Sequence, residues 1–153
     1  MHTPSPFEAP RVQLVEIRLV AEFTTQQQVH EPRDIGRMLH DLVGSADREH
    51  FVAVYLDARH RVTHVHTVSV GHLTATTVHP REVFKGALLA NAQALVVGHN
   101  HPSGDVNPSQ EDRAVVERLR QAGTVLGIEL LDAVIVGPGR SFYSFASECA
   151  SQL

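Results

Sequence analysis

Apolar residues along this chain follow two different periods, and the two kinds of segment alternate. Apolar side chains at every third or fourth position predict amphipathic helices, and short runs rich in β-branched residues predict strands. The alternation predicts an α/β fold in which helices cover the faces of a mixed β-sheet. Helices are predicted for residues 32–43, 80–91 and 109–126, and strands for residues 12–23, 51–56, 61–70, 94–97, 128–136 and 141–145.

Turn residues and composition refine this picture. The four residues 57–60 are short enough to join two strands as a hairpin, and Gly137-Pro138-Gly139-Arg140 predicts another turn. Residues 1–10 contain three prolines and predict a flexible tail, which leaves residues 11–153 as one domain. A chain of 153 residues that is 42% hydrophobic can bury one sizeable core.

Charge and cysteine content exclude several classes of protein. A net charge of −4 gives no electrostatic footprint for nucleic acid, so direct nucleic-acid binding by the isolated chain is not expected. The single cysteine, Cys149, excludes an internal disulfide framework and suits a reducing compartment. No signal-like segment and no apolar run of about 18 residues is visible, so we expect a cytoplasmic protein without a membrane span.

The segment His99-Asn100-His101 carries the clearest chemistry. It follows an apolar strand, and residues i and i+2 of a strand point to the same face. Asp112 follows eleven residues after His101, at the start of the next helical pattern. Two imidazoles and a carboxylate are a common zinc ligand set, which leaves a fourth position for a water whose pKa falls to roughly 7. The alternative is a solvated loop with two incidental histidines before an ordinary capped helix.

Ser109 strengthens the metal-site hypothesis. It stands three residues before Asp112, which is the spacing of a helix N-cap and the N3 residue of a capping box. Such a cap would hold the Asp112 carboxylate in the first turn of the helix, where the helix dipole favours negative charge.

The whole pattern His99-x-His101-(x)7-Ser109-x-x-Asp112 resembles the signature of JAMM (MPN+) metalloproteases. Residues 99–105, together with residues 49–57, 78–84 and 126–132, resemble the RadC-like branch of that group, and the resemblance runs from about residue 32 to residue 145. It implies a cytidine-deaminase-like, three-layer JAB/MPN fold. It also implies one zinc ion per chain and a hydrolase that cleaves a peptide or isopeptide bond.

The chain departs from the RadC-like pattern in two places. RadC-like proteins usually carry an N-terminal helix-hairpin-helix region, and the residues before position 32 are too few to form one. The family pattern also has a histidine after Asp132, where this chain has Ala133, so no side-chain role carries over to that position.

A hydrolase of this kind needs a group that moves a proton from water to the leaving amine. Glu49 is the first candidate, because it directly precedes the buried strand 51–56 and because the JAMM catalytic glutamate starts an equivalent strand. Glu82 is its competitor, although a first-turn helix carboxylate explains that residue equally well. By the same resemblance, Ser109 would donate a hydrogen bond to the developing oxyanion, whereas its simpler role is the helix cap.

The remaining histidines carry less signal. His64-x-His66 repeats the spacing but has no third ligand nearby in sequence, so a solvated strand face is the better interpretation. His79 precedes Pro80, and we expect it to have a capping or turn role.

The sequence thus favours a zinc-dependent hydrolase with a protein or peptide substrate. The alternative is a non-enzymatic binding module that accompanies DNA repair or mobile elements, which only the RadC name suggests. Zinc chemistry on a non-peptide bond is a third possibility, but the Cys-x-x-Cys pair of nucleobase deaminases is absent.

Overall fold

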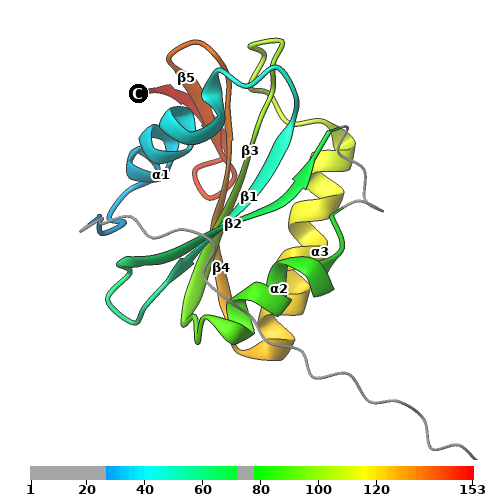
Figure 1. Ribbon diagram of the computed structural model, residues 1–153. Helices are drawn as coiled ribbons and strands as arrows, with labels where there is room; N and C mark the ends of the chain where they lie inside the picture. The colour runs from blue at the N-terminus through cyan, green and yellow to red at the C-terminus, as the bar shows by residue number, and fades with distance from the viewer. Residues whose placement is uncertain (1–26, 72–77) are drawn as a thin grey trace, which may run out of the picture.

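A six-stranded mixed sheet organises the molecule (Figure 1). The computed structural model describes residues 27–71 and 78–153; the predicted tail 1–10 and the predicted strand 12–23 lie outside them. The spatial order of the strands is β2-β1-β3-β4-β5-β6, and only the β3–β4 pair is parallel. The elements are α1 (Pro32–Leu39), the π-helix η1 (His40–Gly44), β1 (His50–Leu56), β2 (Val62–Val70), α2 (Pro80–Leu89), β3 (Ala94–Asn100), α3 (Gln110–Leu126), β4 (Glu129–Val136), β5 (Ser141–Ser144) and β6 (Cys149–Gln152).

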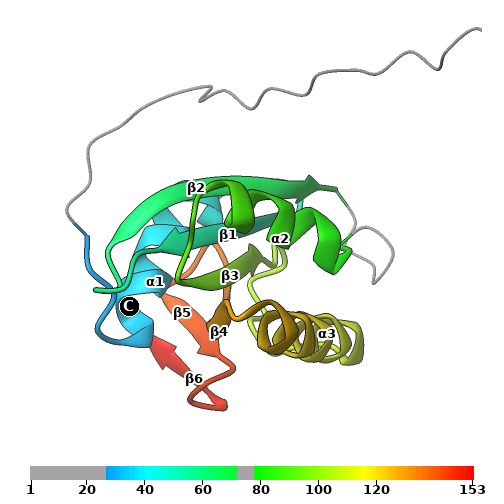
Figure 2. The same cartoon turned by 90° about the horizontal axis from the view of Figure 1, so that it is seen from below.

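Helices cover both faces of the sheet, which makes three layers. Figure 2 shows α1 on one side and α2 with α3 on the other. Successive side chains of a strand point to opposite faces, so the buried strands β1 and β3 supply both cores. The α2/α3 core includes Phe51, Ala53, Tyr55, Val83, Phe84, Leu95, Val97, Val115, Val116, Leu119 and Ala133. The α1 core includes Ile35, Leu39, Val43, Val52, Val54, Leu56, Val96, Val134 and Val136. The predicted α/β fold with a mixed, helix-covered sheet is therefore confirmed.

The predicted hairpin is also confirmed, because β1 and β2 pair antiparallel.

The close packing of α1 against β3 depends on Gly98. A Cβ atom at this position would collide with the side chain of Leu39 and lie 3.0 Å from the carbonyl oxygen of Val134. Glycine lets α1 lie directly on β3, one residue before His99.

Two boundaries differ clearly from the sequence prediction, and one strand was not predicted. The helix predicted over residues 32–43 changes into a π-helix at His40, and such turns leave little trace in apolar periodicity. The strand predicted to end at residue 97 continues to Asn100, because His99 still pairs with both β1 and β4 and Asn100 pairs with β4. Strand β6 was missed, since it is mostly exposed and is held by backbone pairing with β5.

No helix within the described ranges is long and apolar enough to cross a membrane.

Candidate metal centre

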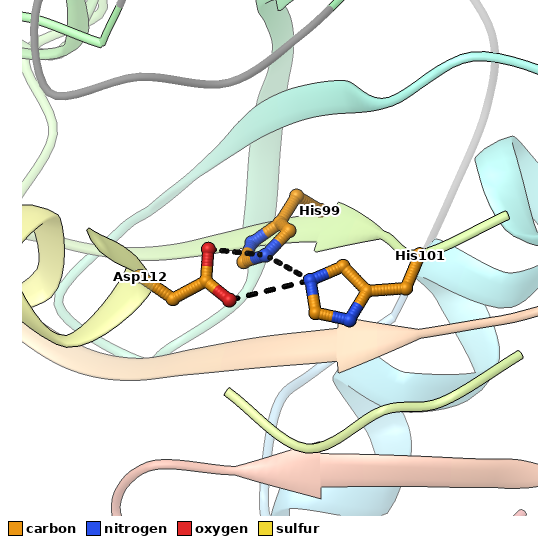
Figure 3. Close-up of side chains that lie close together, drawn as sticks. All are labelled: His99, His101 and Asp112. Carbon is orange, nitrogen blue, oxygen red and sulfur yellow. Dashed lines mark hydrogen bonds and ion pairs between the residues drawn. The ribbon is translucent and has the colours of Figure 1, made fainter. Parts of the chain in front are cut away.

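The two histidines of the motif lie at the carboxyl end of β3, and the carboxylate comes from the first turn of α3. His99 and His101 share a face of the sheet with Val97, which is the face that α3 covers. Asp112 is the third residue of α3, so its side chain reaches back toward the strand. Figure 3 shows the three side chains pointing toward one another.

The spacing of the three ligand atoms suits a small divalent cation. His99 Nε2 lies 3.1 Å from His101 Nε2 and 3.2 Å from Asp112 Oδ1, and His101 Nε2 lies 3.3 Å from Asp112 Oδ2. A tetrahedral zinc site with bonds near 2.0–2.1 Å has ligand atoms about 3.3 Å apart. Among the described residues, this is the only group of three His, Cys, Asp or Glu side chains close enough to share an ion. The predicted set is therefore compatible with a metal site.

Neighbouring groups orient both imidazoles. Nδ1 of His101 lies 2.6 Å from the carbonyl oxygen of Asp105, and that oxygen can only accept a hydrogen bond. The proton of the neutral ring must then sit on Nδ1, which leaves the Nε2 lone pair directed at the other ligands. The His99 ring stacks on Phe51, with centroids 5.9 Å apart and an interplanar angle of 16°.

The Asp112 carboxylate is fixed by the capping box that the sequence predicts. Its Oδ2 accepts a hydrogen bond from the amide of Ser109 at 2.8 Å, and its own amide donates to Oγ of Ser109 at 3.1 Å. Burial raises the pKa of Asp112, but hydrogen bonds to His101 and His99 outweigh it and hold that pKa well below its usual range. Hydrogen bonding to Asp112 raises the pKa of His101 although burial opposes this. The Asp112 carboxylate therefore favours a positive charge at this site, either on an imidazole ring or on a cation held between the imidazoles.

The two candidate proton carriers have different surroundings. Glu49 is half-buried, and its charge contributes to raising the pKa of His101, so the carboxylate lies in the electrostatic range of the cluster. Glu82 lies in the first turn of α2, where it forms an ion pair with Lys85 at 2.7 Å and another with Arg81 at 3.7 Å. These contacts favour Glu49 over Glu82.

Ser109 is exposed at the N-terminus of α3, and its hydroxyl oxygen accepts the capping hydrogen bond. A hydroxyl has one donor and two acceptor positions. Capping uses an acceptor position and leaves the O–H donor unused by the cap. The hydroxyl can therefore act in both the cap and the oxyanion contact.

Two other histidines among the described residues, His66 and His79, have structural roles. His66 is half-buried, and its Nδ1 lies 3.0 Å from the Tyr55 hydroxyl, which departs from the solvated position expected for it. His79 is the N-cap of α2 and accepts a hydrogen bond from the amide of Arg81, as predicted.

The sequence interpretation missed Asn100. Its side chain is fully buried and hydrogen-bonds to the segment that carries Glu49, over a separation of 50 to 54 residues. The position of Asn100 between the two histidines was the only signal in the sequence. Its contact with the Glu49 segment could be inferred only once the pairing of β1 with β3 was known.

Ala133 borders a small recess beside the ligands. His99, Asp112, Val97 and Val115 also line it, and its volume of about 10 Å³ is close to the space that one water occupies. Ala133 pairs with Val97 across β3 and β4 and lines the recess, so its short side chain leaves this space open beside the ligand set.

Comparison with known proteins agrees with the geometry. The RadC-like JAB domain family matches residues 29–150. The chain belongs to this family. Among similar proteins, a UPF0758 protein of Rubrobacter xylanophilus is 50% identical over 111 residues, which are 72% of this chain and 49% of that protein. A UPF0758 protein of Moorella thermoacetica is 47% identical over 124 residues, which are 80% of this chain and 54% of that protein.

An archaeal relative, a UPF0758 protein of Methanosarcina mazei, is 40% identical over 115 residues, 75% of this chain and 50% of that protein. This RadC-like JAB domain therefore spans about half the length of the curated relatives that it matches. Their names state no activity.

Proposed function

We propose that this RadC-like JAB domain is a zinc-dependent hydrolase that cleaves a peptide or isopeptide bond. The observation that carries the proposal is the convergence of two imidazoles and a carboxylate. His99 Nε2 and His101 Nε2 lie 3.1 Å apart, and they lie 3.2 Å from Oδ1 and 3.3 Å from Oδ2 of Asp112, respectively, which is close to the ligand spacing of a tetrahedral zinc site. A non-enzymatic binding module, the alternative from the sequence, gives no reason for this convergence.

His99, His101 and Asp112 would hold the ion. When bound, zinc supplies Lewis acidity and lowers the pKa of a water molecule to roughly 7. The ligand set also suits iron or manganese, so zinc is the part of the proposal that metal analysis must decide.

The chain's own residues then divide the proton and charge handling. The Glu49 carboxylate accepts the proton of the attacking water and passes it to the leaving amine nitrogen. The Ser109 Oγ–H donates a hydrogen bond to the carbonyl oxygen of the scissile bond, which becomes negatively charged as the water adds. The orienting hydrogen bond from His101 to the Asp105 carbonyl keeps Nε2 available throughout.

The experiment is a cleavage screen with matched histidine variants. The zinc-loaded domain is incubated with proteome-derived peptides and with peptides joined through lysine isopeptide bonds, and new amino groups are detected by mass spectrometry. We expect cleavage by the wild-type chain, none by the His99→Ala/His101→Ala variant, and unchanged cleavage by the His64→Ala/His66→Ala control. Equal product from the wild type and the His99→Ala/His101→Ala variant would refute peptide hydrolysis at this site.

A further inference from the structure

Asn100 joins the metal-site strand to the segment that carries Glu49. Its side chain is 0% exposed. Oδ1 accepts a hydrogen bond from the amide of His50 at 2.7 Å, and Nδ2 donates to the carbonyl oxygens of Arg48 at 2.9 Å and Ala46 at 3.3 Å. The bonded groups lie on both sides of Glu49, so the amide holds the backbone immediately before and after that residue.

The strand register explains how this anchor reaches the site. Phe51 of β1 pairs with His99 of β3 in an antiparallel ladder. Phe51–His99 is the last pair of this ladder, and Glu49 and His101 lie two residues beyond it on their respective segments. On β3, alternation turns the Asn100 side chain to the face opposite His99, so it binds the backbone around Glu49 without entering the ligand set.

A further hydrogen bond, which does not involve Asn100, restrains the same segment. The carbonyl oxygen of Glu49 accepts from the amide of Gly71 at 2.8 Å. With the two Asn100 contacts at Arg48 and His50, three consecutive residues of the backbone are fixed. The Glu49 carboxylate therefore starts from a defined backbone position.

We propose that Asn100 is the positioning residue for Glu49, an inference that rests on the hydrolase function proposed above. Only an amide side chain offers an acceptor for His50 and two N–H donors for Arg48 and Ala46 from one short group. A proton carrier must stay within hydrogen-bond reach of the atom it serves, and a misplacement of about 1 Å can cost roughly 10²-fold in rate.

The test uses Asn100→Ala and Asn100→Asp in the full chain. Asn100→Asp keeps the shape and the acceptor for His50 but loses both donors, so it provides a second variant if Asn100→Ala folds poorly. We expect zinc content to stay near that of the wild type, the His50 amide to exchange faster in Asn100→Ala, and kcat to fall roughly 10- to 100-fold with little change in KM. The control is Ser144→Ala, which removes a buried hydrogen bond to Asp132 in the same sheet and should leave kcat unchanged.

A double variant separates positioning from general structural damage. Asn100→Ala should slow the wild type but not Glu49→Gln, because no proton carrier is left to position. Additive losses of kcat in Asn100→Ala/Glu49→Gln would overturn the inference. A kcat like that of the wild type in both Asn100→Ala and Asn100→Asp would overturn it as well.

Failure of the hydrolase function remains distinguishable from failure of this inference. If the wild type cleaves neither class of peptide, the proposed function falls, and crystal structures of the wild type and Asn100→Asp then decide the anchoring. A Glu49 carboxylate displaced from His101 in Asn100→Asp would support the anchor. A Glu49 carboxylate that is unmoved in Asn100→Asp, together with unchanged exchange of the His50 amide in Asn100→Ala, would overturn it.

Discussion

Ser109 and Asp112 hold each other in place at the start of α3. The Asp112 amide donates to Oγ of Ser109 at 3.1 Å, and the Ser109 amide donates to Oδ2 of Asp112 at 2.8 Å. The same Oδ2 lies 3.3 Å from Nε2 of His101. The helix cap and the third ligand are thus one structure, because one of these two reciprocal hydrogen bonds caps the helix and the other orients the carboxylate.

Substitutions at Ser109 separate the cap from the proposed oxyanion contact. Replacing an N-cap serine by alanine costs about 1 kcal/mol of stability, whereas glycine costs only a few tenths. Both replacements remove the hydroxyl donor, so we expect kcat to fall by a similar factor, roughly 10²- to 10³-fold, in Ser109→Ala and Ser109→Gly. Thermal unfolding and kinetics on one cleaved peptide measure the two effects. If the kcat losses follow the stability losses, Ser109 is a cap alone.

Metal binding should depend on one of the two His-x-His segments only. Protein purified without added metal should contain about one equivalent of divalent metal, mostly zinc, as a single three-ligand site implies. His99→Ala/His101→Ala should remove it, because one carboxylate cannot hold the ion. His64→Ala/His66→Ala is the matched control, since those residues lie on β2 with no third ligand among the described residues. Elemental analysis of the three proteins decides the assignment, and metal retained by the first variant would contradict it.

Glu49→Gln should keep the metal and lose turnover. The substitution preserves the shape of the side chain and removes the proton acceptor, so kcat should fall roughly 10²- to 10⁴-fold. Glu82→Gln should change kcat little, because the Glu82 carboxylate pairs with Lys85 on α2. Metal content and kcat are measured for both variants. A large loss in Glu82→Gln with activity retained in Glu49→Gln would require the two roles to be exchanged.

The metal-site geometry was largely predictable because it is local. Alternation on a strand puts His99 and His101 on one face, and a capping box places Asp112, so 14 consecutive residues contain most of the information. The role of Asn100 was not predictable in this way. It depends on β1 lying beside β3, a pairing between segments 50 residues apart that apolar periodicity does not specify.

The order of the strands in the sheet could not be predicted from the sequence either, because it also depends on pairing between distant segments. Periodicity identified five of the described strands as segments, but not that β1 lies between β2 and β3. The missed strand β6 shows the other limit, since Cys149–Gln152 carries almost no apolar pattern and pairs through its backbone. The recess at Ala133 also required coordinates, because a cavity depends on every side chain around it.

Gly98→Ala should destabilise the fold through the contact of α1 with β3. The added methyl group meets the Leu39 side chain in a closely packed layer, and overpacking of this kind costs about 1–3 kcal/mol. Gly139→Ala is the control, because no atom lies within 4 Å of a Cβ at that position. Denaturant unfolding of the two variants gives the free energies. Equal stabilities would show that α1 can move away from β3 at little cost.

The isolated chain should bind DNA weakly and without sequence preference. Affinity for nucleic acid comes mainly from lysine and arginine that neutralise phosphates, and the chain has 13 such residues against 17 acidic ones. Single-strand binding also relies on aromatic stacking, and the chain has no tryptophan, while Phe51, Tyr55, Phe84, Phe142 and Tyr143 are buried. A mobility-shift titration with duplex and single-stranded DNA at about 150 mM salt, where the screening length is physiological, provides the test. Submicromolar binding to either form would contradict the prediction and would favour the accessory binding module over the hydrolase. Weak binding that vanishes as salt rises is the expected result, because only scattered surface charges contribute to it.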